Sequence, residues 1–283
     1  MTHYDQHALH ELRAWQTRMR RRPGLLDHLT RGVQGRLNRV IPEKIHVALT
    51  ATIKQLVRGV LFGAGATTAP ALPGAPSLTA RELVVQERIG AYRRLASAEG
   101  AATGAGGFLL GLADFPLLLG LKLKLLFEIA ALYGHDTRHY TERLYLLHIF
   151  QLAFSSQHGR NAVFRQIEHW DAYTATLPPD VQEFDWRTFQ QEYRDYIDLA
   201  KLAQLVPIIG AAVGAVANYR LVGQLGQTAM MAYRLRHFAA AGGAAPGTQP
   251  GLEPGLEPGL EPGAEPGTPA RLPPPAPPPL LLD

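Results

Sequence analysis

Apolar side chains recur every three or four residues along much of the chain, as they do on one face of an α-helix. One such row ends before Pro42 and a second follows it. The first row consists of Leu25, Leu29, Val33 and Leu37, and the second of Ile45, Leu49, Ile53, Leu56 and Val60. Strict alternation, the mark of a strand, is mainly found at residues 121–125, whose flanks favour a helix. The pattern therefore predicts an all-α protein.

Two more helices are predicted from capping residues. Thr79 and Glu82 have the spacing of a capping box, in which each side chain bonds the backbone amide of the other. The helix that they would open carries Leu83, Ile89, Tyr92 and Leu95 on its apolar side. Asp185 is a good N-cap residue for a later helix that runs towards residue 205.

Two long apolar blocks stand out, at residues 100–133 and 202–219. In the first block, Asp114 followed by Pro116 is typical of a helix start, so we predict two helices that meet at Asp114. Each is shorter than the roughly 20 residues that a membrane-spanning helix needs. Gly134 suits the position just after the last helical turn of this block.

Small residues recur at four-residue spacing in both blocks, which lets two helix backbones approach closely. We therefore predict helix packing at Gly100, Gly104, Gly107, Gly111, Gly210 and Gly214. The result would be a helical bundle with Gly/Ala-rich central helices. Two interpretations stay open: the blocks form a soluble core, or they are embedded in or docked onto a membrane.

The C-terminal segment has a composition of its own. The sequence Gly-Leu-Glu-Pro is repeated from residue 251, and 13 of the 22 prolines lie between Pro246 and Pro279. Because proline lacks the amide donor, we expect a disordered tail that serves as a spacer. The predicted division is 1–62 for basic amphipathic helices, 63–77 for a linker, 78–238 for a helical core and 239–283 for the tail.

Composition narrows the classes of function. The chain has 283 residues and no Cys, which excludes disulfides, thiolate metal sites and a cysteine nucleophile. No ATP-binding or hydrolase motif is present, and the histidines lack consistent ligand spacing, so we predict no metal and no cofactor. The polar start, Met1 to His7, contains no secretory segment, and we expect a cytoplasmic protein.

Positive charge gathers near the N-terminus. Residues 1–60 carry 11 Lys/Arg and 4 Asp/Glu. A tryptophan close to an arginine cluster predicts contact with an anionic membrane surface, through Trp15, Arg18, Arg20, Arg21 and Arg22. A solvated helix face is the alternative, and nucleic-acid binding is not favoured because Trp15 is the only aromatic residue near the cluster.

Asp114 and Glu128 are the candidate catalytic residues. Both lie in an apolar block, where burial raises the pKa of a carboxyl group and enables acid–base chemistry. The structural alternatives are a helix cap for Asp114, and a pair with Lys124 or a core hydrogen bond for Glu128. Asn218 would be an amide inside an apolar helix, where a packing hydrogen bond is the usual role.

Residues 99–136 and 201–219 resemble the central and C-terminal signatures of the EcsC family. The positions that carry the resemblance are Asp114, Pro116, Glu128, Tyr133, Gly134, Asp136, Pro207 and Asn218. The similarity extends over about residues 40–238 and excludes the arginine-rich first 40 residues and the tail. The resemblance implies a bacterial, largely helical protein without an established activity, and an accessory role beside an ABC transporter.

The leading hypothesis is a non-catalytic accessory protein, peripheral to the cytoplasmic membrane and linked to ABC transport or secretion. Its expected partners are an anionic membrane surface and a membrane transport protein, and a homo-oligomer stays open. One alternative is a lipid- or small-molecule hydrolase with Asp114 or Glu128 in an apolar pocket. The other is a soluble helical adaptor.

Overall fold

The computed structural model describes residues 1–21, 51, 54–55, 57–60, 77–105, 107–155, 157–183, 185, 189 and 210–241, with the backbone alone at 103–105, 107–115, 157–158, 210–211 and 213. All elements in this part of the chain are helices, which confirms the all-α prediction. They are α1 (His3–Arg20), α4 (Leu78–Ala105), α5 (Gly107–Leu132), α6 (Tyr140–Phe154), α7 (Gln157–Glu168), α8 (Trp170–Thr174), the 3-10 helix η1 (Val181–Glu183) and α11 (Gly210–Ala240).

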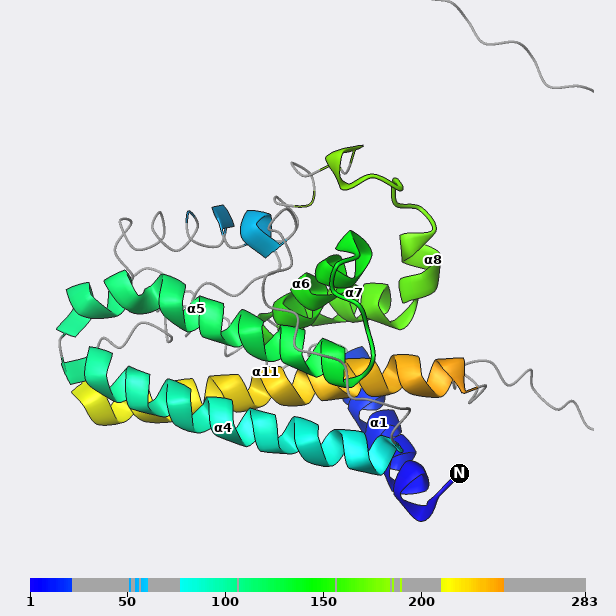
Figure 1. Ribbon diagram of the computed structural model, residues 1–283, viewed down its shortest axis with the longest axis horizontal. Coiled ribbons are helices and arrows are strands. Elements are labelled where there is room, and N and C mark those ends of the chain that lie inside the picture. Colours follow the sequence, from blue (N-terminus) through cyan, green and yellow to red (C-terminus); the bar gives the residue numbers. More distant parts are fainter. Residues whose placement is uncertain are drawn as a thin grey trace, which may run out of the picture. The chain divides into compact units, whose positions relative to one another are not determined.

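The longest helices, α4 and α11, lie side by side in opposite directions (Figure 1). They approach most closely at glycines. A Cβ atom added to Gly100 would lie 2.7 Å from the carbonyl oxygen of Gly214, and one added to Gly226 would lie 2.6 Å from Ile89. This pair forms the backbone of the fold, and α1, α5 and α6 pack against α11.

The first apolar block does not break at Asp114. Helix α5 runs from Gly107 to Leu132 with Pro116 inside it, and the interruption lies instead between Ala105 and Gly107. The predicted start at Asp114 is therefore wrong. Pro116 lacks an amide donor, but the buried side chains of Leu118, Leu119 and the turns beyond them stabilise the helix through packing.

The predicted capping box is also wrong. Helix α4 begins at Leu78, and the Ser77 hydroxyl accepts a hydrogen bond from the Ala80 amide at 3.3 Å. Glu82 is fully buried and pairs with α11 instead of reaching back to an amide. The apolar face is rotated accordingly: Ile89 and Tyr92 are buried, whereas Leu83 and Leu95 are 64% and 54% exposed.

The turn after α5 has the predicted glycine end. Gly134 has φ +86°, its amide bonds the Ala131 carbonyl at 2.9 Å, and the His135 amide bonds the Ala130 carbonyl at 3.0 Å. This is the Schellman hydrogen-bond pattern, in which glycine takes the left-handed position. The turn directs His135 towards the C-terminal half of α11, which it contacts by stacking on Tyr233.

Several predicted features lie outside the described residues: the apolar row at 25–37, Arg22, Pro207, almost all of the linker at 63–77, the helix beyond Asp185, and the tail from residue 242. The chain divides into two units, residues 1–244 and 245–283, and every described residue belongs to the first. Among the helices that the structure describes, none combines the length and the apolar character that crossing a bilayer requires.

Candidate functional site

A buried ion pair joins α4 to α11. Arg234 donates through Nε to Glu82 Oε1 at 2.6 Å and through Nη2 to Oε2 at 2.5 Å, and both residues are at most 1% exposed. The carboxylate also accepts hydrogen bonds from the hydroxyls of Tyr4, at 2.6 Å, and Tyr133, at 2.7 Å. Arg234 Nη1 bonds Glu11 at 2.7 Å. Three helices and the end of α5 therefore meet at Glu82.

The hydrogen-bonding groups of the Glu82–Arg234 pair are all occupied, which favours a structural role over a catalytic one. Burial and the hydrogen bond to Glu82 raise the pKa of Tyr4 to about 12, and burial beside Glu82 raises that of Tyr133 well above its ordinary value. Both phenols are therefore neutral donors at pH 7. Each carboxylate oxygen already accepts two hydrogen bonds, so Glu82 has little capacity left to bind a ligand. Its role is to fix α1 and α4 on α11.

A second charged cluster involves Arg236, two residues further along α11, and is centred on Glu142 of α6. The Glu142 carboxylate accepts bonds from Arg236 Nη1 at 2.7 and 3.0 Å and from the Tyr233 hydroxyl at 2.7 Å. Arg236 also lies over the ring of Tyr145, with its Cζ 4.7 Å from the centroid. His135 lies 3.7 Å from Glu142, but burial lowers its pKa to about 4 and keeps it neutral at pH 7.

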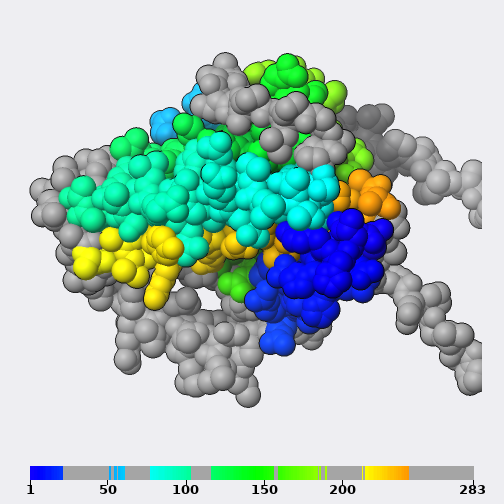
Figure 2. Space-filling view, turned by 60° about the horizontal axis from the view of Figure 1, so that its bottom comes forward, coloured from blue at the N-terminus to red at the C-terminus, as the bar shows by residue number. Residues whose placement is uncertain are grey.

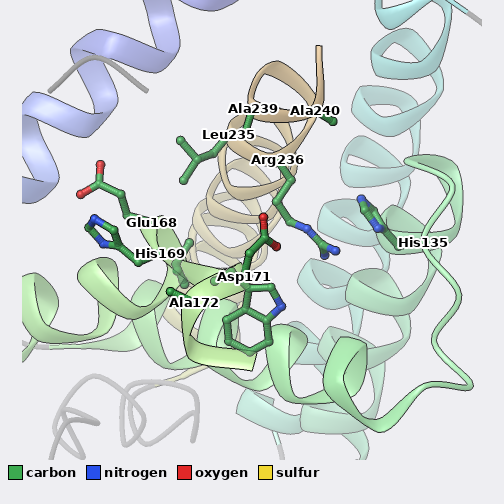
Figure 3. A pocket seen from close by; sticks show the side chains of 11 residues that line it. His135, Glu168, His169, Asp171, Ala172, Leu235, Arg236, Ala239 and Ala240 are labelled. Atoms are coloured by element: carbon green, nitrogen blue, oxygen red, sulfur yellow. The ribbon is translucent and has the colours of Figure 1, made fainter. Parts of the chain in front are cut away.

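Arg236 lines a pocket of about 380 Å³ between the α5–α6 turn, α8 and the last turns of α11 (Figure 3). Its polar lining consists of His135, Glu168, His169, Asp171 and Arg236, and its apolar lining includes Ile167, Trp170 and Leu235. On the α1 side, Glu168 forms an ion pair with Arg20 and accepts a bond from Gln16 at 3.3 Å. This pocket is the candidate functional site.

Of the two carboxylates predicted to act in catalysis, Glu128 has a described side chain. It accepts a hydrogen bond from the Tyr92 hydroxyl at 2.6 Å and lies 4.0 Å from Arg88, so its partners are on α4 and not at Lys124. Asp114 lies inside α5, but its side chain is outside the described residues. The structure does not bring Glu128 into the pocket beside Arg236.

Asn218 makes the predicted kind of packing contact. Its Oδ1 lies 3.4 Å from Nζ of Lys122, which is fully buried and whose pKa burial lowers to about 8. Its Nδ2 has no hydrogen-bond partner among the described residues, and a Cβ atom added to Gly100 would lie 2.7 Å from it. Asn218 and Lys122 therefore form a tight polar contact where α4, α5 and α11 meet.

Residues 135–142, which hold two histidines and two acids, separate into two pairs. His135 lies beside Glu142, whereas Asp136 accepts hydrogen bonds from the neighbouring Arg138, which lower the pKa of Asp136 to about 2. His139 lies 3.9 Å from Asp136. Within the described ranges, no three His, Asp or Glu side chains are grouped so as to hold a metal ion.

The predicted membrane-contact residues divide between the two sides of α1. Trp15 is buried and packs edge-on against Phe164 at 5.2 Å, so its ring is not available to a lipid surface while α1 is docked. Arg20 is exposed but paired with Glu168. Arg18 and Arg21 are exposed. The membrane contact itself stays a prediction.

Sequence reasoning missed Glu82, Glu142, Arg234 and Arg236 as a connected system. The available signal was the pair of arginines at 234 and 236, which with His237 are the only acidic or basic side chains in the sequence from residue 221 to residue 240. Charges in such an apolar helix require buried partners. Their partners are 94 and 152 residues away along the chain, and local spacing does not reveal them.

Comparison with known proteins gives consistent matches. The sequence model of the EcsC protein family matches residues 6–238. Protein EcsC of Bacillus subtilis (strain 168) is 42% identical over 232 residues, which cover 82% of this chain and 95% of that protein. Uncharacterized protein YdbA of the same strain is 35% identical over 141 residues, or 50% of this chain and 52% of that protein. No solved structure matches the chain.

The start of the family match corrects one expectation. The predicted resemblance began at about residue 40 and left out the arginine-rich start of the chain, whereas the match begins at residue 6. Almost all of α1 therefore lies within the shared sequence. The hydrogen bonds of Tyr4 and Glu11 to the Glu82–Arg234 pair agree with this, because they make α1 part of the folded core.

Proposed function

The chain belongs to the EcsC protein family, and we propose that it is a non-catalytic accessory protein that binds the anionic surface of the cytoplasmic membrane through α1. The observation that carries this proposal is the charge of the exposed side of that helix. Its exposed ionisable residues are His3, His7, His10, Arg13, Arg18 and Arg20, followed by Arg21 just beyond the helix.

The two acidic side chains of α1 already interact with other groups of the protein. Asp5 forms a capping box with Thr2, and Glu11 pairs with Arg234. The Glu11 side chain is 42% exposed, but Arg234 engages it, so the exposed charges of α1 that no described acid neutralises are those of Arg13, Arg18 and Arg21. A surface of one sign attracts an opposite charge, and each basic residue near an anionic membrane contributes roughly 1 kcal/mol.

The burial of Trp15 and Leu12 makes this an electrostatic contact and not an insertion. The apolar side of α1 already packs against the fold, so the helix would lie on the headgroups with its arginines towards them. Figure 2 shows α1 on the same face of the molecule as α4 and the first turns of α11. Such binding weakens as salt rises, because the interaction is solvent-exposed.

A vesicle flotation experiment tests the proposal. The full chain is mixed with vesicles that contain or lack anionic phospholipid, at low and at physiological salt. We expect it to float only with anionic vesicles and less at the higher salt. The combined variant Arg13→Gln, Arg18→Gln and Arg21→Gln should bind at least tenfold more weakly.

The matched control is Arg94→Gln, Arg165→Gln and Arg220→Gln, which removes the same charge from exposed positions on α4, α7 and α11. It should float like wild type. Equal loss in both variants would indicate that net charge, and not α1, drives binding. If the wild type stays with the soluble fraction at low salt, the membrane proposal fails and the soluble-adaptor alternative replaces it.

The finer role, beside an ABC transporter or a secretion system, is supported by the family resemblance alone. A hydrolase at Glu128 gains no support from the geometry, because that carboxylate is engaged by Tyr92 and Arg88. The accessory role is tested separately from lipid binding, by whether the chain co-purifies with a membrane transport protein after mild detergent extraction.

A further inference from the structure

The pocket at the end of α11 contains two opposite charges that do not pair with each other. Asp171 of α8 and Arg236 of α11 both line it, and Figure 3 shows the carboxylate and the guanidinium turned towards the same part of the pocket. No ion pair joins these two described residues. The volume of about 380 Å³ is that of a site for a small ligand.

The guanidinium of Arg236 is fixed by its neighbours, and two of its nitrogens remain available as hydrogen-bond donors. Its bonds to Glu142 both start at Nη1, and the guanidinium lies over the ring of Tyr145. Nε and Nη2 make no hydrogen bond to any described residue, and the side chain is 23% exposed. A guanidinium fixed in this way binds an oxyanion without first losing side-chain freedom.

Asp171 supplies the complementary charge. Its backbone carbonyl accepts bonds from the Ala175 amide and the Thr174 hydroxyl, which fix the residue at the start of α8. Its carboxylate accepts no hydrogen bond from the described residues. The nearby Glu168 differs, because Arg20 and Gln16 already occupy it. Asp171 is therefore the carboxylate of the pocket that is ready for a ligand.

We propose that this pocket binds a small zwitterion, a molecule with a primary ammonium group and an oxyanion group a few bonds apart. Arg236 binds the oxyanion and Asp171 binds the ammonium group. The apolar wall of Ile167 and Leu235 contacts the carbon atoms between the two charges.

The distribution of charge favours a zwitterion over a simple ion. A purely anionic ligand would meet the carboxylate of Asp171, and a purely cationic one would meet the guanidinium of Arg236. His135, kept neutral by burial, lines the pocket and adds hydrogen-bonding capacity without net charge. Only a ligand that carries both charges satisfies both sides of the pocket.

Phosphoethanolamine has this chemistry, and it occurs both as a free molecule and as the headgroup of a phospholipid. The proposal does not depend on membrane binding by α1, because the pocket and the exposed side of that helix are different surfaces. Free phosphoethanolamine in solution tests the pocket alone, and a failure there is distinguishable from a failure of vesicle flotation.

The experiment is calorimetric titration of the full chain with free phosphoethanolamine. We expect saturable binding that Asp171→Asn weakens at least tenfold. Asp171 is exposed, so this variant should fold normally, which circular dichroism and thermal melting verify. Arg236→Lys, which keeps the charge beside Glu142, should also weaken binding because lysine lacks the planar pair of donors. Glu87→Gln, an exposed carboxylate on α4, is the control and should bind like wild type.

Two further probes sharpen the result. Phosphocholine carries a quaternary ammonium group that cannot donate a hydrogen bond to Asp171, so it should bind at least tenfold more weakly. Vesicles of phosphatidylcholine, which carry no net charge, are tested with and without phosphatidylethanolamine to identify the source of the ligand. Wild-type binding that requires phosphatidylethanolamine and is lost in Asp171→Asn indicates the lipid headgroup. Binding of free phosphoethanolamine alone indicates a soluble zwitterion. No binding of free phosphoethanolamine at millimolar concentration, or equal binding by Asp171→Asn, would overturn the proposal.

Discussion

Two arginines on α11, separated by one residue, have opposite surroundings. Arg234 is buried, and its bonds to Glu82 and Glu11 use all three guanidinium nitrogens. Arg236 is partly exposed and uses only Nη1. Because α11 turns by about 100° per residue, side chains two apart point in different directions. One therefore holds the fold together, and the other is available to a ligand.

The Glu82–Arg234 pair gives a direct prediction about stability. Arg234→Met removes one partner and leaves the Glu82 carboxylate buried with only the two tyrosine hydroxyls. Loss of one member of a buried pair costs about 3–5 kcal/mol of unfolding free energy. Urea unfolding measures this cost, and Arg20→Met at the exposed Arg20–Glu168 pair is the control, with an expected cost of at most about 1 kcal/mol. Similar costs for both variants would show that burial does not strengthen the inner pair.

The buried His148 side chain should make the free energy of unfolding depend on pH. It is fully buried beside Trp170, and burial lowers its pKa from 6.5 to about 4. The unfolded chain therefore binds a proton between pH 6.5 and 4 that the folded chain does not, and stability is lost as pH falls through this window. For this one group the loss from pH 7 to pH 5 is about 2 kcal/mol.

The variant His148→Gln should remove this part of the pH dependence. The quantity to measure is the difference in unfolding free energy between pH 7 and pH 5, and we expect it to shrink by about 2 kcal/mol relative to wild type. His139→Gln, at a 77% exposed side chain, is the control. An unchanged pH dependence in His148→Gln would mean that His148 is not buried in its neutral form.

At the scale of the helices, close approach of α4 and α11 is the feature most sensitive to substitution. A Cβ on Gly100 would meet the Gly214 backbone at 2.7 Å, and a backbone does not move aside as a flexible side chain does. Gly100→Ala should therefore cost about 1–3 kcal/mol of stability through overpacking.

Gly120 offers the matched control, because it also lies inside a helix but has nothing within 4 Å of an added Cβ. Gly120→Ala should stabilise the protein by about 0.5–1 kcal/mol, through the higher helix propensity of alanine. Chemical unfolding of both variants gives the comparison. If Gly100→Ala is as stable as Gly120→Ala, the two long helices are farther apart than the structure places them.

Helix boundaries also show what local sequence predicts well. The end of α5 at Gly134 was predictable because the left-handed position has a residue preference of its own. The supposed starts at Asp114 and at Thr79–Glu82 were not, although the same kind of rule was applied. In both cases long-range packing decides: α5 continues through Pro116 into a buried stretch, and Glu82 pairs with an arginine 152 residues away.

For the whole molecule, the all-α fold was predictable from periodicity, but the pocket was not. The pocket joins residues of α5–α6, α7–α8 and α11, which only the tertiary fold brings together. The basic start of the chain was evident in the sequence, yet its two sides have different roles. Trp15 and Leu12 attach α1 to the fold, and Arg13, Arg18 and Arg21 remain exposed. One helix therefore serves both the core and the surface.

The central claim is that α1 contacts an anionic membrane with its exposed side while it stays docked. Since the chain has no Cys, a single introduced cysteine carries a fluorescent label at one defined position. Ala14→Cys places the label on the exposed side of α1, and Glu87→Cys places it on α4. The measurement is the accessibility of each label to a water-soluble quencher, with and without anionic vesicles. Protection at position 14 and none at position 87 is the predicted result; equal accessibility at position 14 in both conditions, while the protein floats with the vesicles, would contradict the claim.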